Sequence, residues 1–344
     1  RALRQRYPEA AISALVTPHT AALLAGNDAV DEIISFEKGR FDALGPLVGR
    51  DALDALRDLW RLGRALRRRR FDVLVLCHHL FTRWGALKYA ALSLAAGAPV
   101  RVGLDNGRGW FLTHRVPDQG FGARHEADYW LALGATLDAV HPSPRLEVHL
   151  TPAERDWARR WWDAAELDDE PVAAIHPGSG RFSVARRWPA ERFVRVADAL
   201  AERGWRVVVV MGPDEVDLAR DVVERARRPT PLLSVPSPRH LVAVLERCRV
   251  AITNDSGVMH LAVAAGTPTV AIFGPSNAMA WGPYGGRATV VAAGLPCSPC
   301  LYHDQALGRR EGCAGRWCLH AVTPEMVLQA VERLAGSAAE PRKH

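Results

Sequence analysis

The residues best suited to chemistry lie in one segment, residues 254–275, which reads NDSGVMHLAVAAGTPTVAIFGP. It follows an apolar run, and its small polar residues Asp255, Ser256 and Gly257 suit a turn that starts a helix. The first N–H groups of a helix have no partner inside it, so they attract anions. The segment predicts a strand, an anion-binding turn, a helix carrying His260, and a second strand. The alternative is a plain crossover in which Asp255 only caps the helix.

Two turns further upstream have the same form. Residues 172–180 (VAAIHPGSG) run from an apolar strand into a loop that contains Ser179 and Gly180. Residues 206–215 (RVVVVMGPDE) run from a strand into a helix that begins near Glu215. Because the carboxyl ends of parallel strands meet at one edge of a sheet, we expect all three turns to converge on one site.

The elements that must position these turns alternate between strand and helix along the whole chain, which indicates an α/β fold class. In the first part we expect strands at residues 11–16, 32–36, 71–76 and 100–103, and helices at 18–24, 51–68, 82–96 and 124–133. A break at residues 136–150 follows, then further alternation to residue 291 and a last helix at 324–334. A length of 344 residues fits about two domains. We therefore expect an N-terminal domain at 1–145, a C-terminal domain at 151–335 and a flexible tail at 336–344.

The order of these motifs resembles that of glycosyltransferase family 9, the ADP-heptose:lipopolysaccharide heptosyltransferases. The similarity is carried by HPGS, RRWP, RF and ADAL within residues 176–200, by VVMGPDE at 209–215 and by residues 254–276. Weaker matches are residues 71–76, residues 98–103, and His125-Glu126 ahead of Leu133-Gly134. The resemblance implies the GT-B architecture, in which two Rossmann-like domains with parallel sheets face a central cleft. The C-terminal domain would mainly hold the nucleotide-sugar donor, and the N-terminal domain the acceptor.

The resemblance also implies which residues bind the donor. They are Ser179, Gly180, Arg186, Glu215, Asp255, Ser256, Gly257 and His260. Arg186, where the family often has Lys, would stabilise the departing diphosphate. Glu215 would accept bonds from ribose hydroxyls, unless it is only a first-turn acid favoured by the helix dipole. His260 would add a polar contact, unless it only packs on its helix, and Trp188 suits the core.

The general base has no assignment. In the family, a strand and a Gly-rich loop come before the helix that corresponds to the first residues of this chain. That loop carries an acidic residue thought to accept the acceptor's proton. No residue of this sequence matches that position. Asp105, Glu126 and Asp128 could face a cleft, although a solvated or capping role is the simpler interpretation of each.

The function implied by the resemblance is an inverting transfer of heptose from an ADP-sugar to a lipopolysaccharide core or Kdo-lipid A acceptor, with no cofactor required. Two other classes stay open. One is a non-hydrolysing nucleotide-sugar epimerase on a related fold, and the other is a non-catalytic nucleotide-sugar-binding module.

The charge of the chain bears on its partners. The net charge is +6, and a run of arginines covers Arg61, Arg64 and residues 67–70. Such a run either forms a solvated helix face or binds an anionic surface, such as a phosphorylated glycolipid or the inner membrane leaflet. No signature of a nucleic-acid-binding domain is present, so we expect no nucleic-acid partner. No apolar run reaches the roughly 18 residues of a membrane span. We expect a cytoplasmic monomer, peripheral to the inner membrane, that acts on a glycolipid.

The six cysteines form two groups. Cys77 and Cys248 lie in or beside apolar strands and suit buried core thiols. The other four are Cys297, Cys300, Cys313 and Cys318, with His303 as a substitute ligand. Their spacing permits a structural zinc site, a disulfide or reduced thiols, and a cytoplasmic location makes the disulfide the least favoured. No metal is required for catalysis, because a cation and helix N-termini can stabilise the leaving group.

Overall fold

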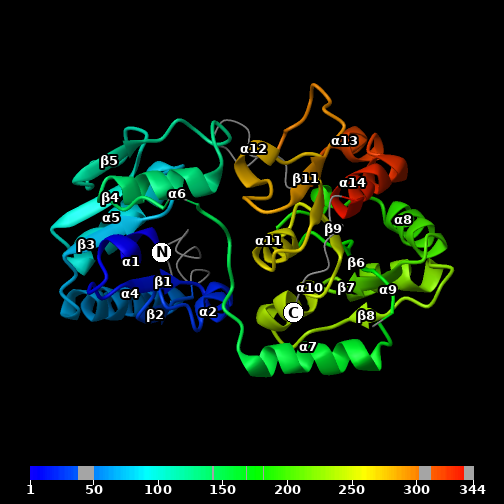
Figure 1. Cartoon of the computed structure of the whole chain (residues 1–344). Helices are drawn as coiled ribbons and strands as arrows, with labels where there is room; N and C mark the ends of the chain where they lie inside the picture. The colour runs from blue at the N-terminus through cyan, green and yellow to red at the C-terminus, as the bar shows by residue number, and fades with distance from the viewer. Residues whose placement is uncertain (38–49, 142, 168, 181, 302–310, 337–344) are drawn as a thin grey trace. The chain divides into compact units, whose positions relative to one another are not determined.

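A computed structural model of the chain describes residues 1–37, 50–141, 143–167, 169–180, 182–301 and 311–336 (Figure 1). The chain divides into two compact units, Arg1–Pro142 (unit 1) and Ser143–His344 (unit 2). The predicted tail lies outside the described residues from residue 337 onward. Among the residues described, no helix is both long enough and apolar enough to cross a membrane.

Unit 1 alternates strands and helices. Its strands are β1 Ser13–Val16, β2 Glu32–Ser35, β3 Val73–Leu76, β4 Val100–Asp105 and β5 His114–Pro117. Its helices are α1 Ala2–Arg6, α2 Pro18–Leu24, α4 Arg50–Arg68, α5 Arg83–Ala96 and α6 Glu126–Ala135.

The strands of unit 1 pair in parallel as two sheets, β1-β2 and β3-β4-β5. The core around the second sheet has two parts. On one side Val102 and Leu104 of β4 pack against Tyr129 and Leu133 of α6. The other part lies under α5, where small residues such as Ala86 and Ala90 pack with Leu80, Phe111 and Leu112.

Unit 2 contains a larger set of elements. Its strands are β6 Val172–His176, β7 Arg206–Val210, β8 Leu232–Leu233, β9 Val250–Asn254, β10 Thr269–Ile272 and β11 Ala288–Val291. Its helices are α7 Pro152–Ala164, η1 Val184–Arg186 (a 3₁₀ turn), α8 Ala190–Glu202, α9 Val216–Arg225, α10 Pro238–Leu245, α11 Gly257–Ala264, α12 Ala278–Trp281, α13 Trp317–His320 and α14 Pro324–Gly336.

These six strands form one parallel sheet in the order β8-β7-β6-β9-β10-β11. In chain order this is 3-2-1-4-5-6, the doubly wound Rossmann arrangement. The order reverses between the neighbours β6 and β9, where Ile175 pairs with Ile252 and His176 with Thr253. Ligands of such sheets bind beyond the carboxyl ends of the strands at this switch point.

The alternation of side chains along the strands divides the core of unit 2 between the two faces of the sheet. On one face Ile175, Val209 and Ile252 pack against α8, α9 and α14. On the other face Ala174 and Val208 pack against α7, α10 and α11. Figure 1 shows the strands lying between these two groups of helices. Burial on both faces explains the continuous apolar runs of these strands.

The predicted α/β fold class is confirmed, and the predicted elements of unit 1 agree with the structure to within a few residues. The helix expected at 82–96 begins at Arg83, because the Thr82 side chain accepts a bond from the Gly85 N–H and acts as the N-cap. The short strand β5 and the helix α7 were not predicted from the sequence.

Candidate functional site

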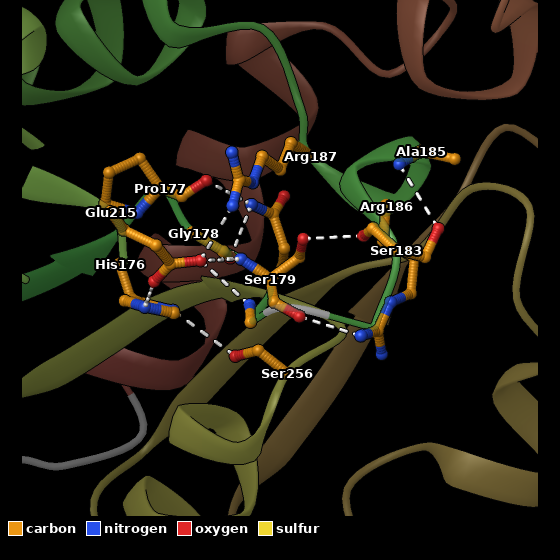
Figure 2. A network of polar contacts seen from close by, with 12 residues as sticks. His176, Pro177, Gly178, Ser179, Ser183, Ala185, Arg186, Arg187, Glu215 and Ser256 are labelled. Atoms are coloured by element: carbon orange, nitrogen blue, oxygen red, sulfur yellow. Dashed lines mark hydrogen bonds and ion pairs between the residues drawn. The ribbon is translucent and has the colours of Figure 1, made fainter. Parts of the chain in front are cut away.

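The three loops identified from the sequence follow β6, β7 and β9, the strands at and beside the switch point of unit 2. The structure brings them into direct contact. His176 bonds to Glu215 and lies 3.3 Å from the Ser256 hydroxyl, while Arg186 bonds to Asp255. Figure 2 shows the part of this network around His176, Ser179 and Glu215.

The Glu215 carboxylate is the centre of the network. It is only 5% exposed and accepts bonds from the N–H groups of Ser179 (2.7 Å) and Gly180 (2.8 Å). Two side chains also bond to the carboxylate, through His176 Nε2 at 3.0 Å and Arg187 Nη2 at 3.2 Å. Burial alone would raise the pKa of Glu215, but His176 and the two amides outweigh burial and hold the pKa at about 2. Glu215 is therefore ionised and fixes the loop after β6.

Two glycines make room for this carboxylate. A side-chain carbon added at Gly178 or at Gly212 would overlap the Glu215 carboxylate oxygens. Gly180 has a φ of +70°, in the left-handed region that favours glycine. The glycines of both loops are thus explained by the buried charge.

The N–H and hydroxyl groups of Ser179 and Gly180 that were predicted to bind the nucleotide sugar form hydrogen bonds within the protein. The Ser179 hydroxyl donates to the Ser183 carbonyl at 2.8 Å, and both amides bind Glu215. Direct bonds from these groups to a phosphate or ribose would have to replace the internal ones. Binding of the nucleotide-sugar donor by Ser179 and Gly180 stays a prediction, as does a contact between Glu215 and the ribose.

Arg186 forms a largely buried ion pair with Asp255. Arg186 Nη1 lies 3.2 Å from Asp255 Oδ2, and Arg186 Nη2 donates to the Ser179 carbonyl at 2.7 Å. The side chains of Arg186 and Asp255 are 12% and 6% exposed. Within the residues described, Arg186 Nε is buried without a hydrogen-bond partner. The guanidinium is therefore held in place by its two Nη groups, while its buried Nε–H is unused.

The first turn of α11 lies beside this ion pair in the chain. Ser256 is the N-cap residue, but its side chain does not cap the helix and instead faces His176. A side-chain carbon at Gly257 would meet no atom within 4 Å, so the space beside this backbone is open. His260 is partly buried in the same helix, one turn later. A fixed cation and an accessible helix N-terminus are together suited to bind a phosphate group.

Asn254 is a site residue that the sequence analysis missed. It is fully buried, and its Nδ2 donates to the carbonyls of Pro177 (2.7 Å) and Gly178 (3.0 Å). Its Oδ1 accepts a bond from the backbone N–H of Trp188 at 3.0 Å. Trp188 itself packs in the core, as predicted. A polar side chain at the end of an apolar strand was the available signal for Asn254.

In unit 1, Glu126 is not solvated but buried against His79, which the sequence analysis did not identify. His79 Nδ1 lies 2.9 Å from Asp118 Oδ2, and His79 Nε2 lies 3.1 Å from Glu126 Oε2. Burial alone would lower the pKa of His79, but the two carboxylates outweigh it and raise the pKa to about 9. Asp105 holds the loop after β4, because its Oδ1 accepts bonds from the N–H groups of Gly107 and Gly109.

None of the six cysteines forms a disulfide. The prediction that Cys77 is buried is wrong, because it lies exposed in the loop after β3, whereas Cys248 is buried as expected. Burial and the neighbouring cysteines raise the pKa of Cys300 and of Cys318. In the described ranges no group of three or more His, Cys, Asp or Glu residues is placed to hold a metal ion. The structure thus gives no support to zinc, and His303 lies outside the described residues.

Comparison with known proteins gives a consistent result. The profile of glycosyltransferase family 9 (heptosyltransferase) matches residues 59–309. The chain is 25% identical over 346 residues to lipopolysaccharide heptosyltransferase 2 of Salmonella typhimurium, which covers 97% of this chain and 92% of that protein.

Two solved structures have the same fold. A glycosyl transferase family 9 protein from Veillonella parvula superposes with a TM-score of 0.77 at 24% identity, covering 98% of this chain and 91% of that one. The ADP-heptose lps heptosyltransferase II of E. coli superposes with a TM-score of 0.70 at 22% identity, covering 99% and 94%.

Two α/β units with parallel sheets, similar to solved structures over nearly the whole chain, define the GT-B fold. The match to the profile is more specific. The chain belongs to glycosyltransferase family 9.

Proposed function

We propose that the protein transfers a heptose from ADP-heptose to a lipopolysaccharide core acceptor, with inversion at the anomeric carbon. Two findings support the substrates. The Salmonella relative is a lipopolysaccharide heptosyltransferase and is similar over nearly its whole length. The E. coli protein of the same fold is described as an ADP-heptose heptosyltransferase. The family match leaves the epimerase and the binding module without support.

The observation that carries the proposal is the Arg186–Asp255 pair beside the first turn of α11. The acceptor hydroxyl attacks the anomeric carbon, and the bond from that carbon to the β-phosphate oxygen breaks. ADP leaves with the bonding electrons, so negative charge grows on its diphosphate. Arg186 and the N–H groups of α11 would stabilise that charge without a metal ion.

The remaining donor-site residues would position these groups. Asp255 holds the Arg186 guanidinium at 3.2 Å and so limits its rotation. Glu215 holds the loop whose Ser179 carbonyl accepts the second bond from Arg186. Ser256, Gly257 and His260 lie at the start and on the first turns of α11, and their role would be to contact the phosphates. The acceptor's proton passes to a base that we leave unassigned.

The acceptor determines where the reaction takes place. A lipopolysaccharide core carries lipid A, which is embedded in a membrane. We therefore propose that the enzyme works on the cytoplasmic face of the inner membrane and associates with it peripherally, as a monomer.

The direct test is product analysis. Full-length protein is incubated with ADP-heptose and either Kdo-lipid A or a core acceptor that already carries one heptose. Mass spectrometry should show an acceptor that gains one heptose and an equal amount of ADP. ADP-heptose alone serves as the control, because an epimerase would change its sugar without an acceptor. Tight binding of ADP-heptose without any product would indicate the binding module.

A further inference from the structure

Helix α5 has an exposed apolar face. Trp84, Leu87, Ala91 and Leu94 follow one another at spacings of three and four residues, which places them on one side of the helix. Trp84, Leu87 and Leu94 are 49%, 52% and 46% exposed. The opposite side of α5, with Ala86 and Ala90, packs in the core. Half-exposed large apolar residues in a row along one helix are typical of an interaction surface.

Helix α4 extends this face with a further exposed tryptophan. The two helices pack against each other, and a hollow of about 760 Å³ lies between them. Trp60, Arg64 and Arg67 of α4 line the hollow with Ala91 and Ala95 of α5. Trp60 is 63% exposed. The apolar stripe of α5 therefore continues across the hollow to Trp60, and we call the whole surface the α4–α5 face.

Positive charge borders the apolar part of the α4–α5 face. Arg61, Arg64, Arg67 and Arg68 are all exposed on α4, and the Arg64 guanidinium lies 5.2 Å from the centre of the Trp60 ring. Arg61 is 3.4 Å from Asp58, but Arg64, Arg67 and Arg68 have no carboxylate partner among the residues described. The charge is thus not neutralised within the described protein.

We propose that the α4–α5 face docks on a lipid surface that contains anionic headgroups. Tryptophan and leucine side chains would enter the boundary between headgroups and acyl chains, while the arginines contact the anionic headgroups. The combination is complementary to an anionic bilayer in both polarity and charge. The proposal rests on the proposed function, because an enzyme acting on a lipid-anchored acceptor gains from contact with the membrane that holds it.

Vesicle flotation tests the proposal. The full-length protein is mixed with vesicles of phosphatidylcholine alone or of phosphatidylcholine with phosphatidylglycerol, and the bound fraction is measured at several salt concentrations. We expect binding to the anionic vesicles that weakens as salt is added. Each cation removed should weaken binding about fivefold, so Arg64→Gln/Arg67→Gln together should cost about 30-fold. Trp84→Ser/Leu87→Ser should also weaken binding severalfold, because the apolar contact is lost.

A matched variant controls for loss of an exposed tryptophan in general. Trp317 of unit 2 is 69% exposed, and Trp317→Ser should leave vesicle binding unchanged. Circular dichroism and ADP binding by the same samples show whether a variant is still folded. Absence of binding to anionic vesicles, or unchanged binding by both double variants, would overturn the proposal. So would dimers that form through this face and disappear in the variants, since the partner would then be a second copy of the chain.

A water-soluble acceptor separates this proposal from the proposed function. With a deacylated core oligosaccharide, the variants of the α4–α5 face should transfer heptose at the wild-type rate. If the wild-type protein binds vesicles through this face but transfers no heptose to either acceptor, the docking surface stands and the proposed function fails.

Discussion

At the scale of single residues, the Glu215 carboxylate shows how one buried charge can organise a site. It accepts bonds from two consecutive backbone amides and from two side chains, and it needs Gly178 and Gly212 to fit. Removing the charge would leave the amides of Ser179 and Gly180 without a charged acceptor. Buried groups that lose their partner cost more than the bond itself contributed.

This charge predicts a dependence of stability on acid. The pKa of Glu215 is about 2 in the folded protein, below its ordinary value of 4.5, so its stabilisation is present above pH 4.5 and is lost as the pH falls toward 2. Glu215→Gln should lower the free energy of unfolding by about 3 kcal/mol near neutral pH, and the difference from wild type should shrink below about pH 4.5. Urea denaturation at a series of pH values measures it.

An exposed glutamate of the same unit provides the comparison. Glu332 pairs with Arg203 on the surface, and its side chain is 61% exposed. Glu332→Gln should change stability by less than about 1 kcal/mol. If Glu215→Gln behaves like this control, or if its effect grows as the pH falls, the assignment of Glu215 as an ionised structural hub is wrong.

At the scale of elements, His79 joins three segments of unit 1. It follows β3, its partner Asp118 follows β5, and its partner Glu126 is the first residue of α6. Carboxylate oxygens only accept hydrogen bonds, so both ring nitrogens carry protons and the imidazole is charged. The ring is 3% exposed, stacks on the Phe81 ring and meets the Tyr129 ring edge-on.

The His79 contacts predict a loss of stability in base. The pKa of His79 rises from 6.5 to about 9 on folding, so its stabilisation is complete below pH 6.5 and is lost as the pH rises through 9. We expect a contribution of about 3 kcal/mol that His79→Gln removes. NMR titration of the imidazole should give the raised pKa directly. An ordinary titration near pH 6.5 would contradict this account.

Much of the fold follows from local patterns in the sequence. Apolar runs such as residues 206–210 predict strands because both faces of the sheet are covered. The helix α7 also had a local signal that was not used, because Thr151 and Glu154 form a capping box at its start. The strand β5 had none, since four residues reading HRVP have neither an apolar run nor alternation.

The site is predictable only in part, for a physical reason. The loops and their chemistry follow from residues at strand ends, but their partners depend on strand order. Glu215 meets Ser179 because β7 lies beside β6, and Asn254 meets Pro177 because β9 lies on the other side of β6. Local sequence patterns do not determine which strands lie side by side in a sheet. The partners of His79, His176 and Asn254 therefore could not be predicted from the sequence.

At the scale of the whole molecule, the chain combines two units with different tasks in the proposed reaction. Unit 2 carries the fixed cation of the proposed donor site, and unit 1 carries the α4–α5 face. Transfer of heptose needs both substrates, so turnover reports on the complete protein, whereas the proposed site predicts that donor affinity depends on unit 2. A residue that acts on the leaving group should separate these two quantities.

Arg186 gives the most direct test of the central claim, that the switch point of unit 2 stabilises a departing ADP. The measurement compares the single-turnover rate of heptose transfer with the calorimetric affinity for ADP-heptose in wild type, Arg186→Ala, Arg186→Lys and the exposed-surface control Arg203→Ala. We predict that Arg186→Ala lowers the rate by about 10²–10³ while affinity falls less, because the charge on the diphosphate grows in the transition state. Arg186→Lys should retain part of the rate, since the positive charge persists. A transfer rate for Arg186→Ala equal to that of wild type, or an equal loss in rate and affinity, would contradict the claim.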